Sequence, residues 1–178
     1  MQELVVLSGK GGTGKTSIVG SFAAVAQSKV LADCDVNAAD LHLLLKPVIQ
    51  RQNEFWCGQV SFIDGGKCIH CKLCQNLCHF NAIKDFKVAP ISCEGCGFCS
   101  RICPAEAITM KENLSGCWFI SNTKYGPLAY GRLGIAQQDS GKLVALVRKQ
   151  AKLIAEKQGL DYIISDGPSG IGCQVIPS

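Results

Sequence analysis

Two runs of cysteines carry the chemistry that is easiest to identify in this sequence. They are Cys68-x2-Cys71-x2-Cys74-x3-Cys78 and Cys93-x2-Cys96-x2-Cys99-x3-Cys103. An Ala-Ile pair follows each run at the same distance, as Ala82-Ile83 and Ala107-Ile108, so the two runs form an internal repeat. Zinc sites have wider gaps between two pairs of ligands, whereas close triplets of thiolates bind three irons of one four-iron cluster. We therefore expect two iron–sulfur clusters, with zinc as the alternative.

This spacing is that of bacterial two-cluster ferredoxins, in which the fourth cysteine of each run ligates the other cluster. Pro104 follows the second run as that pattern requires, and His79 stands at the equivalent place in the first run without removing a ligand. The predicted ligands are Cys68, Cys71, Cys74 and Cys103 for cluster I and Cys78, Cys93, Cys96 and Cys99 for cluster II.

A glycine-rich loop near the N-terminus is typical of phosphate binding. Residues 9–16 fit the pattern G-x4-G-K-S/T and lie between an expected buried strand, residues 3–7, and an expected helix, residues 15–27. We expect Lys15 to reach the β- and γ-phosphates and the Thr16 hydroxyl to bind Mg²⁺. A chance glycine-rich turn is the alternative. The predicted nucleotide-binding residues are Gly9, Lys10, Gly11, Gly12, Thr13, Gly14, Lys15, Thr16 and Ser17.

Acidic residues end two further apolar runs that we expect to be buried strands. Asp33 and Asp35 follow residues 30–32, and Asp166 follows residues 162–165. Carboxylates at such strand ends hold Mg²⁺ in phosphoryl-transfer enzymes, so Asp166 is a predicted magnesium ligand. A plain turn at the end of the strand is the alternative for Asp33 and Asp35.

Composition narrows the classes of function. The twelve cysteines would suit a secreted disulfide scaffold, but the ligand spacing and the absence of an apparent export signal favour a reducing cytoplasm. The formal charge of +4 is scattered, and two clusters of roughly −2 each would offset it, so we do not expect nucleic-acid binding. We find no apolar run of the length of a membrane span.

The order of expected elements predicts an α/β fold. A short helix over residues 38–45, a strand over 117–121, and a helix capped by Ser140 and ended by Gly159 complete the pattern of strands and helices. Such alternation indicates a mostly parallel sheet. We predict a P-loop ATPase domain in two parts, residues 1–56 and 111–178, with an inserted two-cluster ferredoxin α+β domain at residues 57–110.

The whole chain resembles the MinD/ParA/nitrogenase iron protein group of P-loop ATPases, in a form carrying an inserted two-cluster ferredoxin domain. The resemblance lies in the loop with its second lysine, Lys10, in Asp33-Cys34-Asp35, in both cysteine runs, and in residues 140–144 and 166–173. It implies that Lys10 reaches the partner's phosphates in a nucleotide-sandwich dimer, with a solvated loop lysine as the alternative. It also implies that Asp35 orients the attacking water and that Asp33 supports Mg²⁺. The resulting sets are Lys10, Lys15 and Asp35 for catalysis and Thr16, Asp33 and Asp166 for magnesium.

Members of that group continue beyond the point where this chain stops. We therefore expect a truncated sheet with an unpaired edge beside the first strand, and a homodimer or a complementary chain that completes the ATPase. Cys34, Cys57 and Cys117 are expected to be simply buried. Cys173 is expected to be structural near a dimer face, with a cluster-bridging ligand or redox thiol as the alternative.

The leading hypothesis is an ATPase that couples nucleotide-driven dimer closure to electron transfer or to iron–sulfur handling, with an unidentified redox partner. A non-hydrolysing electron carrier or redox-sensing module with a regulatory nucleotide site is the alternative. Delivery of clusters to other proteins is a third hypothesis.

Overall fold

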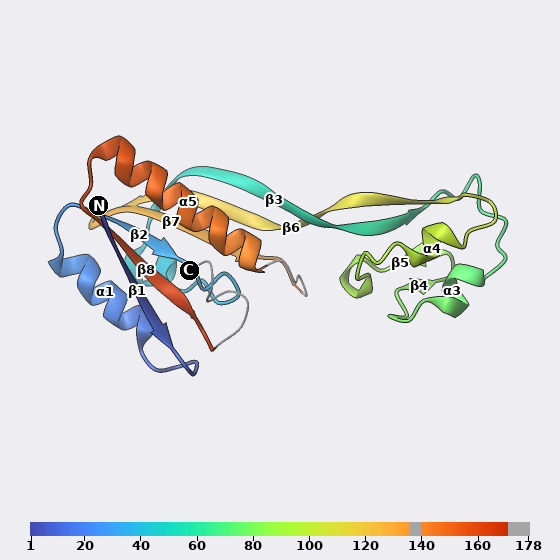
Figure 1. Cartoon of the computed structure of the whole chain (residues 1–178), viewed down its shortest axis with the longest axis horizontal. Coiled ribbons are helices and arrows are strands. Elements are labelled where there is room, and N and C mark those ends of the chain that lie inside the picture. Colours follow the sequence, from blue (N-terminus) through green and yellow to red (C-terminus); the bar gives the residue numbers. More distant parts are fainter. Residues whose placement is uncertain (136–139, 171–178) are drawn as a thin grey trace. The chain divides into compact units, whose positions relative to one another are not determined.

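A computed structural model describes residues 1–135 and 140–170 of the 178-residue chain and has a mixed α/β architecture (Figure 1). Its central sheet has the strand order β1-β8-β2-β7-β6-β3. The parallel strands are β1 (Gln2–Ser8), β8 (Tyr162–Ser169), β2 (Lys29–Asp33) and β7 (Gly126–Leu133). Strand β6 (Ile108–Thr123) is antiparallel to β7, and β3 (Val48–Ile63) lies beside it at one edge.

Strand β1 forms the other edge of the described sheet, where the sequence predicts an unpaired strand. The expectation that this strand is buried is wrong in part. Leu4 and Leu7 are exposed because only one neighbouring strand, β8, pairs with β1 in the described part of the chain. In contrast, every residue of β2, which lies inside the sheet, is buried.

Helices cover both faces of this sheet. Tyr130 of β7 packs in a cluster with residues of α1 (Lys15–Val25) and α2 (Leu41–Leu45). The next residue, Gly131, faces α5 (Ser140–Gln158), since an added Cβ there would lie 2.9 Å from Leu143 Cγ. Successive residues of a strand point to opposite faces. The two helix groups therefore lie on opposite faces, which is the arrangement expected for a parallel sheet.

The apolar core explains why these elements hold together. Val19, Leu31, Leu41, Leu128 and Leu143 have no exposed side-chain surface. Burying a side chain of this size stabilises the fold by about 1.5–3 kcal/mol. The helices predicted over residues 15–27 and between Ser140 and Gly159 are confirmed, with α1 ending at Val25. The helix predicted over 38–45 is shorter and begins at Leu41, and Ser140 is the first described residue of α5.

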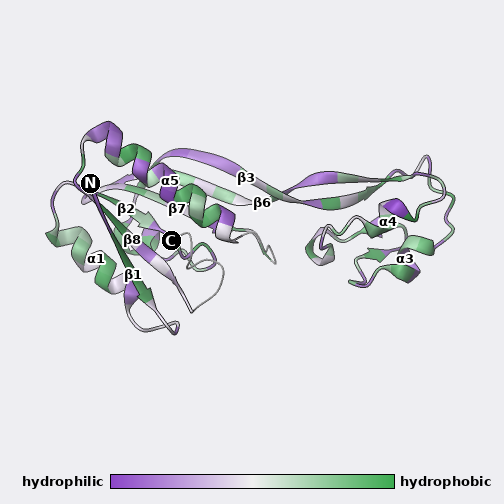
Figure 2. Ribbon diagram, viewed as in Figure 1, coloured by the Kyte–Doolittle hydropathy of each residue, from purple (hydrophilic) through white to green (hydrophobic). Residues whose placement is uncertain are grey.

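No sequence pattern predicts β3 or β7, and the strand predicted over residues 117–121 is only part of β6. Residues 50–54 of β3 are all polar or charged, as the purple colour of this strand in Figure 2 shows, and four of the five are exposed. A strand at the edge of a sheet needs little apolar surface, so no apolar run marks β3 in the sequence.

The described chain divides into two units. One consists of Met1–Phe55 and Gly116–Gly134 with α5 and β8, and the other of Trp56–Ser115. The second unit contains α3 (Leu73–Leu77), a hairpin of β4 (Ile83–Lys84) and β5 (Lys87–Val88), the short turn η1 (Pro90–Ser92) and α4 (Phe98–Arg101). No helix among the described residues is long and apolar enough to cross a bilayer.

Candidate functional site

The backbone of the unit Trp56–Ser115 repeats along with its cysteines. Three pairs of residues at equivalent places in the two runs have left-handed backbone conformations, although most are not glycine. Such conformations are uncommon for non-glycine residues and occur mostly in tight turns. The pairs are His70 and Gly95, with φ of 55° and 64°, Lys72 and Gly97, with 63° and 71°, and Asn81 and Glu106, with 51° and 46°.

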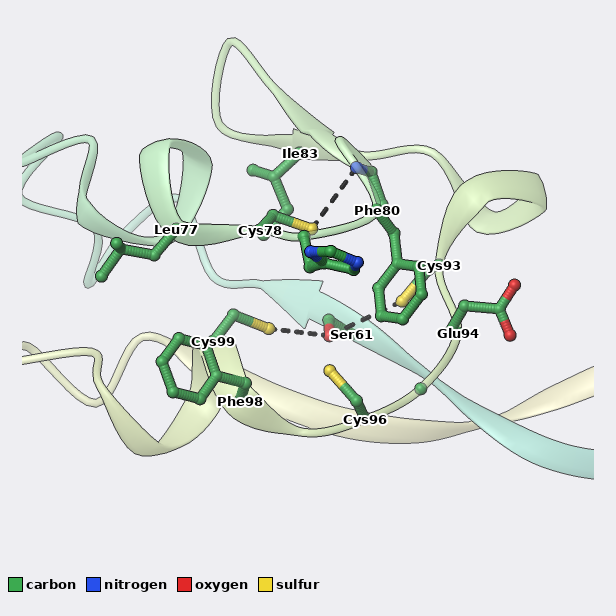
Figure 3. Close-up of a pocket in the computed structure, with 13 residues that line it drawn as sticks. Ser61, Leu77, Cys78, Phe80, Ile83, Cys93, Glu94, Cys96, Phe98 and Cys99 are labelled. Carbon is green, nitrogen blue, oxygen red and sulfur yellow. Dashed lines mark hydrogen bonds between the residues drawn. The ribbon is translucent and has the colours of Figure 1, made fainter.

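Four thiols line a first cavity of about 200 Å³ in this unit (Figure 3). Three belong to the second cysteine run and the fourth ends the first run, so both halves of the repeat contribute to one cavity. Apolar side chains, among them Leu77, Phe80, Ile83 and Phe98, form much of the remaining wall. The thiols are those of Cys78, Cys93, Cys96 and Cys99, which the sequence analysis groups as the ligands of cluster II.

The other four thiols line a second, narrower cavity of about 20 Å³. Here the first run supplies three cysteines and the second run supplies the fourth. Ile63, Ile69, Phe86 and Ile108 contribute the apolar wall. The thiols are those of Cys68, Cys71, Cys74 and Cys103, the predicted ligands of cluster I.

Matching backbone donors point at one sulfur in each set. The amide N–H of Ala82 donates to Cys78 Sγ, and that of Ala107 donates to Cys103 Sγ, both at 3.4 Å. These bonds explain why the Ala-Ile pairs repeat at the same distance, since the first residue of each pair donates a hydrogen bond to the fourth cysteine of its run. Donors of this kind stabilise a thiolate or a cluster sulfur and tune the electron affinity of the centre.

The donor chemistry of both cavities fits a polynuclear cluster. Thiols, N–H donors and apolar walls are the surroundings that iron–sulfur clusters need. Among the described residues, no three His, Cys, Asp or Glu side chains are close enough together to bind a single metal ion. A four-iron cluster has no such requirement, since each thiolate binds a different iron atom. The first cavity has more room for such a group, and the second is contracted around its thiols.

Cys74 and Cys99 connect the two cavities. Both are buried in one apolar cluster with Ile83 and Ile108, although Cys74 lines the second cavity and Cys99 the first. Burial raises the pKa of Cys74, and the neighbouring sulfurs of Cys99, Cys103 and Cys68 raise it further. The raised pKa means that forming the Cys74 thiolate is unfavourable, and a bound metal would offset this by stabilising the thiolate.

Ser61 is a polar residue of the first cavity that the sequence analysis missed. It lies on β3, it is buried, and its hydroxyl oxygen is 3.0 Å from Cys99 Sγ and 3.8 Å from Cys93 Sγ (Figure 3). No motif marks this serine, because it reaches the cysteines through the fold rather than through sequence spacing. Ile63, two residues further along β3, lines the second cavity instead.

The glycine-rich loop lies between β1 and α1, as expected. Gly12 and Gly14 have φ of 73° and 90°, which side chains rarely adopt, and an added Cβ at either would meet no atom within 4 Å. The loop therefore keeps open space beside its backbone. Lys15, the first residue of α1, is buried, whereas Lys10 and Ser17 are exposed.

The three predicted carboxylates lie at one end of the parallel sheet, close to this loop. The pairing of β2 with β8 sets Asp33 opposite Asp166, and Thr16 Oγ1 donates to Asp166 Oδ2 at 2.5 Å. Asp33 accepts the backbone N–H groups of Asp35, at 3.1 Å, and of Leu41, at 3.0 Å. Asp33 thus stabilises the turn that leads to α2, because both of its carboxylate oxygens accept backbone hydrogen bonds there.

The electrostatics of this acidic group favour a cation. Burial raises the pKa of Asp166 and Asp35, and Lys15 opposes both shifts. The pKa of Asp33 is raised well above its usual range by burial and by the charge of Asp166. Asp166 Oδ1 is buried and has no hydrogen-bond partner among the described residues. Oxygen ligands of this type suit Mg²⁺.

The remaining cysteines differ in exposure. Cys34 is buried as predicted, and burial raises its pKa to about 12. The expectation of simple burial is wrong for Cys57 and Cys117, which are only half-buried because they lie on β3 and β6 near the edge of the sheet. Cys173 lies outside the described residues.

An archaeal protein matches this chain over nearly all of its length. An uncharacterized protein of Methanocaldococcus jannaschii, MJ0578, is 35% identical over 179 residues, which cover 99% of this chain and 63% of that protein. The chain therefore spans less than two thirds of the length of this relative. No known protein-family profile matches the sequence.

Shorter matches involve parts of known enzymes. Pyruvate synthase subunit PorD of Methanothermobacter marburgensis is 39% identical over 58 residues, which are 32% of this chain and 72% of that subunit. An archaeal-type glutamate synthase (NADPH) of Thermotoga maritima is 38% identical over 56 residues, which are 28% of this chain and 11% of that enzyme.

Proposed function

We propose that the unit Trp56–Ser115 is an iron–sulfur electron-transfer module with two four-iron clusters. The observation that carries this proposal is the gathering of eight cysteines into two sets of four, each around its own cavity. The partial similarities to PorD and to the glutamate synthase support an iron–sulfur role for part of this chain.

Each set of ligands combines residues from both halves of the repeat. Cys68, Cys71, Cys74 and Cys103 would hold one cluster, and Cys78, Cys93, Cys96 and Cys99 the other. When bound, such clusters accept and release single electrons. The protein's own contribution is to exclude water with apolar walls and to direct the N–H groups of Ala82 and Ala107 at the sulfurs.

We further propose that the loop at residues 9–16 binds MgATP in the manner of the MinD/ParA/nitrogenase iron protein group. The open, glycine-lined backbone and the N-terminal end of α1 favour phosphate. Lys15 would neutralise phosphate charge, and Thr16 with Asp166 would hold Mg²⁺. In this proposal Asp35 orients the attacking water and Lys10 acts across a dimer.

We also propose that nucleotide binding and electron transfer are coupled. The chain spans 63% of the length of MJ0578, so the coupling is a proposal about the whole protein. We propose that a homodimer, or a complementary chain, forms the hydrolytic state. An acceptor or donor protein for the electrons completes the scheme.

The test starts with anaerobic purification and quantitation of iron and acid-labile sulfide. We expect about eight of each per chain and an EPR signal of interacting four-iron clusters on reduction. Absence of both in freshly isolated protein would refute the electron-transfer proposal.

Calorimetric titration with a non-hydrolysable ATP analogue and Mg²⁺ tests the second site. Lys15→Ala should abolish binding, and Lys152→Ala, which removes an exposed lysine of α5, should not. Binding without hydrolysis in the full-length protein would favour the regulatory alternative. Binding unchanged by Lys15→Ala would refute the assignment of the loop.

A further inference from the structure

Ser61 introduces a difference between two otherwise matched cysteine sites. Its hydroxyl oxygen is buried and lies 3.0 Å from Cys99 Sγ, 3.5 Å from Met110 Sδ and 3.8 Å from Cys93 Sγ. All three neighbours are sulfur atoms. A buried hydroxyl among sulfur atoms is expected to donate its single hydrogen to one of them, since leaving a buried donor unpaired costs about 1–3 kcal/mol.

Ligation decides the direction of this hydrogen bond. In the structure Cys93 Sγ donates to Ser61 Oγ, Ser61 Oγ donates to Met110 Sδ, and either partner of the Ser61–Cys99 contact can be the donor. When both cysteines are thiolates bound to iron, neither has a proton to give. Ser61 is then the only donor of the group, and the sulfur of Cys99 is its nearest acceptor.

The matched site has no such hydroxyl among its lining residues. Ile63 lines that cavity from the same face of β3, two residues after Ser61. The backbone donors do not distinguish the sites, since Ala82 and Ala107 make equivalent bonds of 3.4 Å. Ser61 is thus a side-chain donor that only one of the two sites possesses.

We propose that Ser61 donates a hydrogen bond to the Cys99 thiolate and thereby raises the reduction potential of the cluster on Cys78, Cys93, Cys96 and Cys99. This inference rests on the proposed electron-transfer function. Reduction adds negative charge to a cluster and its sulfurs, so a donor to a ligand sulfur stabilises the reduced form more than the oxidised form. Ser61 therefore helps to set how readily this cluster holds the electron.

Charged residues near the two cavities oppose the effect of Ser61 on the difference between the two potentials. A negative charge near the first cavity lowers its potential, and a positive charge near the second raises that one. Glu94 lines the first cavity and Lys72 the second, and both are exposed, so solvent screens their effects. The order of the two potentials therefore does not isolate Ser61. A comparison of the same cluster with and without the hydroxyl does.

The experiment is an EPR-monitored redox titration of the cluster-loaded protein and three variants. Ser61→Ala should lower one of the two potentials, with about a tenfold fall in the ratio of reduced to oxidised cluster at a fixed potential, which is 59 mV for one electron. Ser61→Thr keeps the hydroxyl and should keep the potential. Ile63→Val alters the other cavity without changing a polar group and should leave the Ser61-sensitive potential unchanged.

The outcomes separate this inference from the function on which it rests. If the wild-type protein contains no clusters, the proposed function fails before Ser61 is examined. If Ser61→Ala retains both clusters with neither potential changed, the role of Ser61 is wrong and the electron-transfer function stands. Equal shifts of both potentials, or a shift in Ser61→Thr as large as that in Ser61→Ala, would also overturn the proposal.

Discussion

The hydroxyl of Thr16, in the first turn of α1, donates to Asp166 Oδ2 of β8 at 2.5 Å, although 150 residues separate them in sequence. Parallel pairing of β1 with β8 explains the contact, because it sets the start of α1 beside the last part of β8. The bond engages one oxygen of Asp166 and leaves Oδ1 buried without a partner among the described residues. Leaving such an oxygen unsatisfied costs about 1–3 kcal/mol, which a bound cation would offset.

Asp166→Asn should weaken binding of a magnesium nucleotide tenfold or more, about 1.4 kcal/mol, because it removes the negative charge nearest the Thr16 hydroxyl. The measurement is calorimetric titration of the ATP analogue at saturating Mg²⁺. Asp161→Asn is the matched control, since Asp161 is an exposed acid just before the same strand. Equal affinities in all three proteins would contradict the assignment of Asp166.

The same substitution should stabilise the metal-free protein near neutral pH. Burial raises the pKa of Asp166, so the folded state binds this proton more tightly than the unfolded state does. Its stabilising contribution is therefore present at low pH and is lost as pH rises through the folded pKa, which lies above that of an ordinary aspartate. Urea unfolding with EDTA at several pH values should show a shallower loss of stability with rising pH in Asp166→Asn. An identical pH slope in both proteins would contradict this account.

Much of this fold is predictable because its strong signals are local. Apolar runs mark β2 and β8, helical periodicity marks α5, and cysteine spacing marks the repeat. Strand β3 is not predicted because its residues 50–54 are polar and a strand at the edge of a sheet needs little apolar surface. The role of Ser61 is not predictable for another reason. It depends on contacts with cysteines that lie more than 30 positions away in the sequence.

Cys34 should resist alkylation in the folded protein, because burial raises its pKa to about 12 and excludes the reagent. Cys57 and Cys117 are half-buried and should react first. Timed treatment of cluster-loaded protein with iodoacetamide, followed by peptide mass spectrometry, distinguishes the three. Urea should make Cys34 as reactive as the others, and rapid labelling of Cys34 without denaturant would contradict its burial at the end of β2.

Gly131→Ala should destabilise the fold by about 1–3 kcal/mol, because its Cβ would lie 2.9 Å from Leu143 and 3.0 Å from Val147 on α5. The midpoint of urea unfolding, measured without nucleotide, reports the loss. Gly11→Ala is the control, since an added Cβ at Gly11 meets no atom within 4 Å and its backbone is not left-handed. A midpoint equal to that of the control would mean that α5 does not pack closely on β7.

Gly95→Ala should remove one cluster and spare the other. Gly95 has a φ of 64°, and an added Cβ would clash with the backbone carbonyl oxygen of Gln59, so the segment between Cys93 and Cys96 would have to move. Only the first cavity depends on this segment, because Gly95 lines it together with four cysteines.

The equivalent residue of the other run is His70, which adopts φ of 55° with a side chain, so His70→Ala is the matched control. We expect iron content to fall from about eight to about four per chain in Gly95→Ala and to stay at about eight in His70→Ala. Loss of both clusters in Gly95→Ala would show instead that the two sites assemble as one cooperative unit.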